Sequence, residues 1–317
     1  MKQTLSRLAT AVLPSQVLLG LALLQALAPP QALAQTRLRI ASFNAENYLV
    51  QPAPGRRPKP VASRDKVAEL LADLHPDIVA LQEVGGHDAL ADLQSRLHAR
   101  GLALPHAELV RGHDPDIAVA VLSRFAFSSR SAHTNDSYLL DGRRLRTSRG
   151  FAQVTFSPSP GYHVFLLAAH LKSKRAVGAA PESEMREQEA ILLREKIDAI
   201  LQSDPDANVV VCGDFNDTQA SPALRALYGK GARMLIDTRP AEPSPAGHPH
   251  ASASPRRVTW THHFARDDAF TRIDYILVSR GMAREWRPDG TCIHPTKDWG
   301  MASDHRPILA EFDATDR

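Results

Sequence analysis

The stretch VVVCGDFND, residues 209–217, raises the question why a buried strand should end in a carboxylate and an amide. Four apolar residues lead directly into a glycine, and Asp214 and Asn216 follow two positions apart. A continuous apolar run of this kind is typical of a strand that is buried on both faces. Gly, Asp and Asn are also common turn residues, so turn chemistry alone is one interpretation. The alternative interpretation is a functional site, and the residues at the ends of the other apolar runs distinguish it from turn chemistry.

The bulk composition is that of an ordinary globular protein. The chain has 317 residues, of which 43% are hydrophobic and 23% charged, with a formal net charge of +3. This length suits one large domain or two small ones. Because the charges nearly balance, any affinity for a polyanion must come from a local cluster of basic side chains.

The first 34 residues differ from the rest. They begin with two basic residues, continue with VLLGLALLQALA (17–28), and end in a small-x-small site at Ala34. This pattern predicts a secretory signal peptide over 1–34 and an exported, periplasmic or secreted, single domain over 35–317. An uncleaved anchor helix is the alternative, although the apolar run is short for spanning a bilayer.

The two cysteines, Cys212 and Cys292, leave their redox state open. Export permits a disulfide, whereas the apolar strand around Cys212 favours a free thiol that packs as a small hydrophobe. Two cysteines alone do not make a structural zinc site.

Eight apolar, β-branched runs predict strands. They cover 38–43, 77–81, 117–122, 152–156, 162–169, 209–212, 273–278 and 307–312. The fourth and fifth runs, 152–156 and 162–169, are joined by only five residues, SPSPG, which favours a hairpin. The sheets are therefore expected to be mixed, and no internal repeat or domain linker interrupts them.

Helical periodicity fills four of the intervening segments. Ser63 is expected to cap the first helix, Gly101 to end the second, and Ser221 followed by proline to begin the fourth. The third is expected over 182–202, with Ile191, Ile197, Ile200 and Leu201 on one side. Residues 240–256 form a Pro/Ala/Ser-rich loop whose His248 and His250 are interpreted as solvated.

Polar residues follow four of the predicted strands. Asn44 follows the first, Glu83 the second and His170 the fifth, while Asp214 and Asn216 follow the sixth. Glutamate and histidine are not favoured turn residues, so turn chemistry does not explain Glu83 or His170. Strand ends that share one edge of a sheet are where open α/β proteins place their sites.

Three further polar residues come late in the chain. Asp274 stands beside an apolar run, and buried acids are rare unless they are paired. Asp304 and His305 directly precede the last strand. Carboxylate and amide oxygens suit Mg²⁺, Mn²⁺ or Ca²⁺, and an imidazole held by a carboxylate is a general base for water. The set predicts metal-assisted hydrolysis of a phosphate ester.

In this order, the pieces resemble the endonuclease/exonuclease/phosphatase superfamily, the DNase I-like fold. The resemblance spans residues 38 to 312 and is carried by SFNAEN, LQEV, AAHLKSK, GDFND, RIDYILVS and SDHRPI. It implies an α/β fold, a four-layer sandwich of two packed mixed β-sheets flanked by helices, with the site at one end. A non-enzymatic binding module would be expected to lack some of the catalytic residues of this pattern. None of them is missing in this sequence.

The resemblance also implies catalytic roles for five residues. His305 would be the general base, oriented by Asp274. Asp214 and Asn216 would position the scissile phosphate and the attacking water. His170 would hydrogen-bond the phosphate and stabilise its developing charge.

Three more residues would serve a divalent cation under the same resemblance. Glu83 would bind the main ion, Asn44 would assist it, and Asp304 would be a further ligand. The ion is expected to be Mg²⁺, with Mn²⁺ or Ca²⁺ as alternatives. The number of ions stays open.

A basic cluster beside His170 points to the substrate. Lys172, Lys174 and Arg175 are predicted to contact phosphate, and HLKSK is similar to the segment in secreted bacterial nucleases of the superfamily. The stretch GRRLRTSRG (142–150) is either part of the same rim or a solvated loop. A nucleic acid, DNA or RNA, is therefore the expected substrate. The protein is expected to be a monomer.

The alternative substrate class is a phospholipid, sphingomyelin or a small phosphodiester. The sequence shows no amphipathic basic helix and no aromatic-rich hairpin for a membrane surface. Trp260 and Trp299 are the candidate anchors, but a tryptophan beside a strand is more typical of packing. No stable membrane partner is expected once the signal peptide is removed.

Overall fold

The computed structural model describes residues 37–243 and 258–316. The predicted signal peptide, 1–34, and the loop histidines His248 and His250 lie outside these ranges. None of the described helices is long and apolar enough to cross a membrane.

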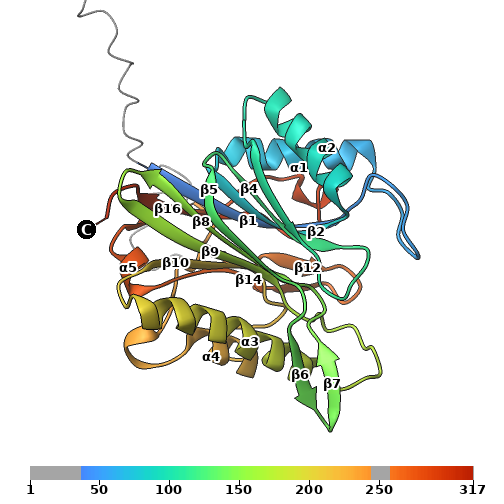
Figure 1. Ribbon diagram of the computed structural model, residues 1–317. Coiled ribbons are helices and arrows are strands. Elements are labelled where there is room, and N and C mark those ends of the chain that lie inside the picture. Colours follow the sequence, from blue (N-terminus) through green and yellow to red (C-terminus); the bar gives the residue numbers. More distant parts are fainter. Residues whose placement is uncertain (1–36, 244–257, 317) are drawn as a thin grey trace, which may run out of the picture. The chain divides into compact units, whose positions relative to one another are not determined.

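Sixteen strands and five α-helices make up the described part of the chain (Figure 1). The strands are β1 Arg37–Tyr48, β2 Ile78–Val84, β3 His106–Val110, β4 Ala118–Ser123, β5 Phe127–His133, β6 Ser137–Leu140, β7 Arg143–Arg146, β8 Phe151–Ser159, β9 Tyr162–His170, β10 Asn208–Asp214, β11 Ile236–Asp237, β12 His262–Phe264, β13 Ala269–Thr271, β14 Asp274–Val278, β15 Trp286–Ile293 and β16 Ile308–Asp313. The helices are α1 Val61–Leu74, α2 His87–Ala99, α3 Glu182–Ser203, α4 Pro222–Tyr228 and α5 Arg280–Ala283, with 3₁₀ turns at Gly231–Arg233 and Trp299–Met301.

Two six-stranded mixed sheets form the framework. The first has the order β15-β16-β1-β2-β4-β3 and the second the order β11-β14-β10-β9-β8-β5. Each contains one parallel pair joined through a helix, β1 to β2 by α1 and β9 to β10 by α3, and the remaining neighbours are antiparallel. All eight predicted strands are present, and the expected mixture of parallel and antiparallel pairs is confirmed.

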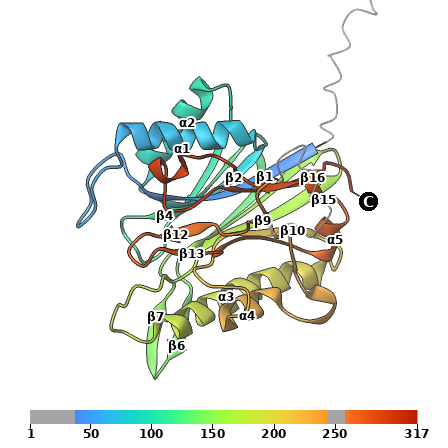
Figure 2. The same cartoon turned by 180° about the vertical axis from the view of Figure 1, so that it is seen from behind.

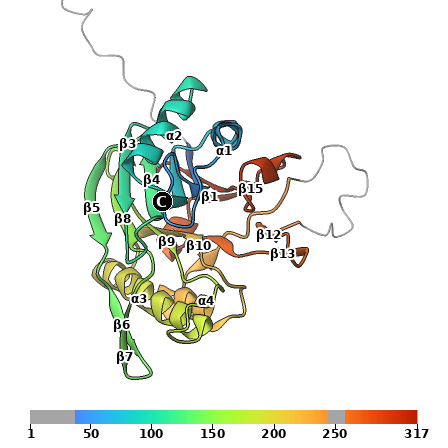
Figure 3. The same cartoon turned by 90° about the vertical axis from the view of Figure 1, so that its right-hand side faces the viewer.

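Three apolar cores separate four layers. The central core lies between the sheets and contains Ile40, Val154 and Ile276. A second core packs α1 and α2 on the outer face of the first sheet, and a third packs α3 and α4 on the outer face of the second. Figure 3 shows the two helical layers on opposite sides of the stacked sheets. The predicted four-layer sandwich is confirmed.

Two predicted helix details are wrong and one is confirmed. α1 begins at Val61 after Pro60, so Ser63 lies inside the helix rather than at its cap. Ile191 of α3 is exposed, because the buried face runs through Ile197 and Leu201 instead. Ser221 caps α4 as expected, accepting a hydrogen bond from the Leu224 amide at 3.2 Å.

Both cysteines are free thiols. Cys212 lies in the central core and Cys292 is partly buried on β15. Burial raises the pKa of the Cys212 thiol to about 12. The disulfide that the sequence left open is therefore not formed, and Cys212 acts as a small hydrophobe.

Two small hairpins extend beyond the sheets. One pairs β6 with β7, and the other pairs β12 with β13. Figure 2 shows both hairpins toward the end of the sandwich away from the C-terminus. Strands this short and polar carry little sequence signal, and neither hairpin was predicted.

Gly213 in the opening stretch is required by a close approach of two backbones. Its φ is +142°, and an added Cβ would lie 1.9 Å from the carbonyl oxygen of Ala169 on β9. We expect Gly213→Ala to destabilise the protein by about 3 kcal/mol or more, measured by urea unfolding. The control is Gly161→Ala, where φ is +79° and nothing lies within 4 Å, which should cost about 1 kcal/mol. Equal losses would show that backbone conformation, not the contact, sets the requirement.

Candidate active site

Three polar residues lie in one row across the second sheet. Asp214, at the end of β10, is the register partner of His170 on β9 and of Asp274 on β14. Register partners present their side chains on the same face of a sheet. His170 Nε2 accordingly lies 3.4 Å from Asp214 Oδ2. The GDFND segment therefore ends β10 within a row of polar side chains that comes from three neighbouring strands, β9, β10 and β14.

Two residues of the first sheet complete the centre of the site. Asn44 Nδ2 donates to Asp214 Oδ2 at 3.0 Å and lies 3.4 Å from Glu83 Oε1. Its Oδ1 accepts from the Glu46 amide at 3.0 Å. Asn44 therefore bridges the carboxylates of the two sheets and is positioned to orient them.

Several site residues have left-handed backbone conformations. Glu46, Asn47, Glu83 and Asn216 have φ values of 44°, 51°, 63° and 54°. The register between β1 and β2 shifts where the first three occur. Such conformations cost free energy in non-glycine residues and re-aim side chains. Their concentration here indicates that the backbone is shaped to bring Glu46 and Glu83 toward the site.

His305 is held from two directions. Its Nδ1 lies 2.8 Å from Asp274 Oδ2, and its amide donates to Ser303 Oγ at 3.0 Å. Ser303 Oγ in turn donates to the Asn44 carbonyl at 2.7 Å. A carboxylate on Nδ1 fixes the proton there and leaves Nε2 available. Nε2 faces Asp214 Oδ2 at 3.7 Å and Asp304 Oδ1 at 3.8 Å.

The charges of the buried groups are strongly coupled. Burial disfavours the imidazolium of His305, but Asp274 and Asp214 outweigh this and raise its pKa to about 10. Burial also raises the pKa of Asp214 to about 7. By contrast, burial lowers the pKa of His170 well below its usual value, and the positive charge of Arg149 lowers it further. His170 is therefore neutral.

Three acidic residues at the same end, Glu46, Glu83 and Asp304, fit a divalent cation, and we call them the acidic group. Burial raises the pKa of Glu46, and the negative charges of Asp304 and Glu83 raise it further, so three acidic side chains interact at this end. The nearest cation is Lys59, whose Nζ donates to the Glu46 carbonyl oxygen at 2.9 Å and lies 3.7 Å from its carboxylate. His262 Nε2 lies 3.6 Å from Asp304 Oδ2. An oxygen-rich donor set of this kind matches Mg²⁺, Mn²⁺ or Ca²⁺.

The site opens into a cleft of about 810 Å³. We call it the catalytic cleft. Its lining includes Asn216, His262 and Asp304, together with the basic residues Lys174, Arg175 and Arg266. Asn216 Nδ2 donates to the Leu171 carbonyl at 3.0 Å, which leaves the side-chain carbonyl oxygen and the second amide N–H for other partners. A phosphate ester in this cleft would meet basic side chains at one wall.

Lys172 is placed differently from its two basic neighbours. Its side chain is buried, and Nζ donates to the carbonyl oxygens of Ser173 and Arg175 at 2.9 and 2.6 Å. The ammonium group is thus used to brace its own loop. Of the three predicted phosphate contacts, only Lys174 and Arg175 line the catalytic cleft.

A sequence model of the Endonuclease/Exonuclease/phosphatase family matches residues 41–305. The chain belongs to this family. The predicted resemblance is confirmed, and the chain is a phosphoesterase of the endonuclease/exonuclease/phosphatase class. The matched range contains every residue of the polar row and of the acidic group.

Solved structures of similar fold come from distant organisms. The endonuclease/exonuclease/phosphatase from Bacteroides vulgatus has a TM-score of 0.60 at 19% identity, covering 88% of this chain and 99% of that one. The catalytic domain of human Nocturnin, with bound sulfate anion, has a TM-score of 0.59 at 17% identity, covering 87% and 94%. Truncated TDP2 from Caenorhabditis elegans has a TM-score of 0.58 at 19% identity, covering 87% and 97%. A search of curated proteins found no match.

The structure brings all eight predicted catalytic and metal residues to one end of the sandwich. It adds Glu46, Lys59 and His262, to which sequence reasoning assigned no role in the site. Lys59 follows a stretch without periodicity, so nothing in the sequence marks it. His262 pairs with His305 through an isolated β-bridge, a contact that connects residues far apart in the chain.

Proposed function

We propose that the chain is an exported, divalent-metal-dependent nuclease that cleaves a phosphodiester by attack of water activated by His305. One observation carries the proposal. His305, buried and fixed at Nδ1 by Asp274, directs Nε2 toward Asp214 and Asp304, beside the catalytic cleft with its basic wall. A base, an acidic group for a cation and a phosphate-sized opening thus meet at one place.

Each residue then has a distinct task. His305 Nε2 takes the proton of the attacking water, and Asp274 keeps the imidazole in the required tautomer. Neutral His170 hydrogen-bonds the phosphate, while Asp214 and Asn216 position phosphate and water. Glu83, Glu46 and Asp304 would hold the cation, with Asn44 orienting Glu83. When bound, Mg²⁺ would neutralise charge on the phosphate oxygens and, by its own positive charge, lower the pKa of the nearby imidazole.

The basic wall favours a nucleic acid over an isolated ester. Lys174 and Arg175 are exposed, and no ion pair engages either one within the described part of the chain. Arg266 lines the same cleft from the β12–β13 connection. Exposed cations along a cleft are expected to follow the backbone of a polyanion. Flanking phosphates would occupy them while the central phosphate reacts.

A membrane lipid is the second candidate substrate, for one reason. The β12–β13 hairpin carries Phe264 and Phe270, which are 41% and 50% exposed, and Phe264 lines the catalytic cleft. Exposed aromatic residues suit an interface with apolar material. However, the Phe270 ring stacks on His263 at 4.2 Å and meets the Trp260 ring at 4.8 Å, so it also packs within the protein. The nuclease proposal therefore takes precedence.

The deciding test is nicking of supercoiled plasmid by residues 35–317, with Mg²⁺ and with EDTA. We expect nicking with Mg²⁺ and none with EDTA, because the acidic group lacks compensating charge without a cation. Sphingomyelin vesicles and bis(p-nitrophenyl) phosphate are assayed beside the plasmid. Hydrolysis of the vesicles without nicking would transfer the proposal to the lipid class, and nicking in EDTA would contradict metal dependence.

Export is proposed from the pattern of residues 1–34. We expect a bacterial host with a secretory pathway to release a mature chain that begins at Gln35. N-terminal sequencing of the released protein checks this directly. Retention of the intact chain in the membrane fraction would instead support an anchor.

A further inference from the structure

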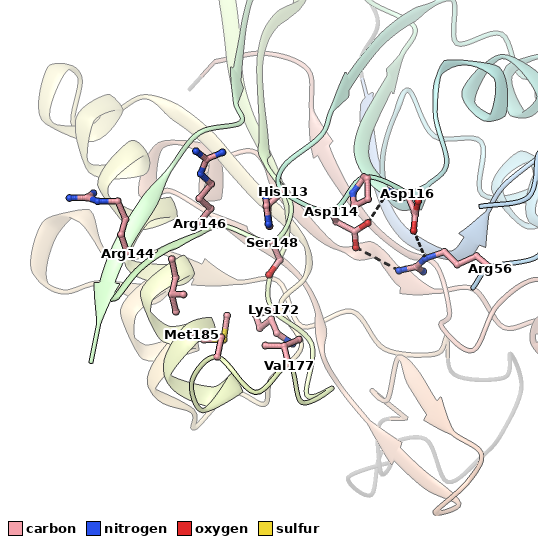
Figure 4. Close-up of a pocket in the computed structure, with 13 residues that line it drawn as sticks. Arg56, His113, Asp114, Asp116, Arg144, Arg146, Ser148, Lys172, Val177 and Met185 are labelled. Atoms are coloured by element: carbon pink, nitrogen blue, oxygen red, sulfur yellow. Dashed lines mark hydrogen bonds and ion pairs between the residues drawn. The ribbon is translucent and has the colours of Figure 1, made fainter. Parts of the chain in front are cut away.

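A second cleft, of about 650 Å³, lies beyond the loop that follows His170. We call it the hairpin cleft, because Arg144, Leu145 and Arg146 of β7 form one of its walls. Figure 4 shows the Arg144 and Arg146 side chains at one end and Arg56, with Asp114 and Asp116, at the other. No residue assigned above to proton transfer or cation binding lines it.

The positive charge of the hairpin cleft is concentrated on β7. Arg56 lies 3.6 Å from Asp114 and 3.5 Å from Asp116, so its charge is compensated. Arg144 and Arg146 are exposed, and within 37–243 and 258–316 neither forms an ion pair. Two guanidinium groups without an ion pair, two positions apart on one strand, form a site for anions.

The rest of the lining is mixed, with the polar residues His113, Ser148 and Lys172 beside an apolar part. Leu145, Val177, Ala179 and Met185 line the cleft between the charged ends. Val177 is 54% exposed, which is high for an aliphatic side chain beside a cleft. An occupant that satisfies both parts of the lining must carry negative charge and a flat apolar surface. A nucleotide with an unpaired base has both.

The hairpin cleft and the catalytic cleft lie on either side of one loop and share it as a wall. Residues 171–179 separate the two, with Lys174 and Arg175 lining the catalytic cleft and Lys172 and Val177 lining the hairpin cleft. Arg143 Nη1 reaches the Ala179 carbonyl at 3.4 Å, so the hairpin contacts the far end of this loop. A strand that lies on Lys174 and Arg175 would therefore reach Arg144 and Arg146 by crossing the loop.

We propose that the hairpin cleft binds a single-stranded segment of the substrate beside the cleaved phosphate. Arg144 and Arg146 contact its phosphates, and the apolar lining receives its unpaired bases. This inference rests on the proposed nuclease function and specifies its substrate as single-stranded nucleic acid. In a duplex the bases face each other and leave the apolar lining without a partner.

The test compares Arg144→Ala/Arg146→Ala with a control that removes the same charge elsewhere, Arg280→Ala/Lys230→Ala. Both control residues are exposed and line neither cleft. The substrates are a single-stranded oligonucleotide of about 20 residues, a blunt duplex of that sequence and bis(p-nitrophenyl) phosphate. The purified protein is assayed with Mg²⁺ over a range of salt concentrations.

We expect the hairpin variant to raise KM for the single strand about tenfold, with the small ester unaffected. The slope of log KM against log salt should fall by about 1.4, the value for two lost phosphate contacts on a single strand. The control should match the wild type. Arg144→Lys/Arg146→Lys, which keeps the charge, should restore most of the affinity for the strand.

Three results would overturn the inference. If the hairpin variant matches the control on the single strand, the cleft does not bind substrate, while the nuclease function stands. If duplex cleavage is impaired as much as single-strand cleavage, unpaired bases are not recognised. If the wild type hydrolyses the small ester but no nucleic acid, the proposed nuclease function fails together with the inference.

Discussion

Asp214→Asn is expected to lower kcat by about 10³-fold while leaving the melting temperature unchanged or raised. Asp214 accepts from Asn44 and faces both histidines, so its charge serves every proposed step. Burial raises the pKa of this carboxyl to about 7. The charged form therefore destabilises the folded protein increasingly from pH 4 to 7, and fully above that range. Asparagine keeps the shape and removes this effect.

The measurement pairs plasmid nicking with thermal unfolding at pH 5 and pH 8. The sign of the stability change follows from the raised pKa, so any gain in melting temperature should be larger at pH 8. Asp289→Asn, at an exposed position, is the matched control and should change neither quantity. A variant that unfolds at lower temperature at both pH values would indicate a structural role for the charge, and full activity would exclude Asp214 from the reaction.

His305→Ala is expected to lower kcat by about 10³-fold, and Asp274→Asn by about 10²-fold, with KM nearly constant. The pH profile separates the two roles. The base acts when neutral, so the rate rises as the pH passes the pKa of His305. Because Asp274 raises that pKa, its replacement should shift the rise to lower pH. A merely structural role for Asp274 would lower the rate without moving the profile.

Nicking that survives His305→Ala would point to a different base or to a contaminating enzyme. His262 supplies the control, because its ring lies 4.6 Å from that of His305. Its carboxylate contact is with the half-exposed Asp304 at 3.6 Å, not with a buried acid such as Asp274. We expect His262→Ala to retain the pH dependence of the wild type. Equal losses in the two alanine variants would assign the base to the pair rather than to His305.

Most strands of the two sheets could be predicted from the sequence, because a buried strand is recognisable from its own run of apolar residues. The runs around Val209–Val211 and Ile276–Val278 are apolar on consecutive positions, since both faces of each sheet are covered. Edge strands such as β5, with the sequence FSSRSAH, lack that signal because only one neighbour covers them. For the same reason β15 and both small hairpins escaped prediction.

The site was predictable in its residues but not in its surroundings. Asp214 and His170 follow strands whose ends share an edge, and this could be inferred without coordinates. Lys59 could not, because it reaches Glu46 through an irregular segment whose course no local pattern fixes. The left-handed conformation of Glu83 was equally hidden, since glutamate has no preference for it. Lys172 was misplaced because a sequence shows the charge of a side chain and not the carbonyl groups that bind it.

The division of the active site between two sheets has a consequence for the protein's biogenesis. Asn44 and Glu83 come from the first sheet, and His170, Asp214 and Asp274 from the second. A folding intermediate with only one sheet formed holds half of the constellation and has no hydrolytic power. If the chain is exported, as proposed, and crosses the membrane before it folds, its activity begins only when the two sheets dock on the far side. The architecture would then protect the producing cell from its own hydrolase without an inhibitor or a propeptide.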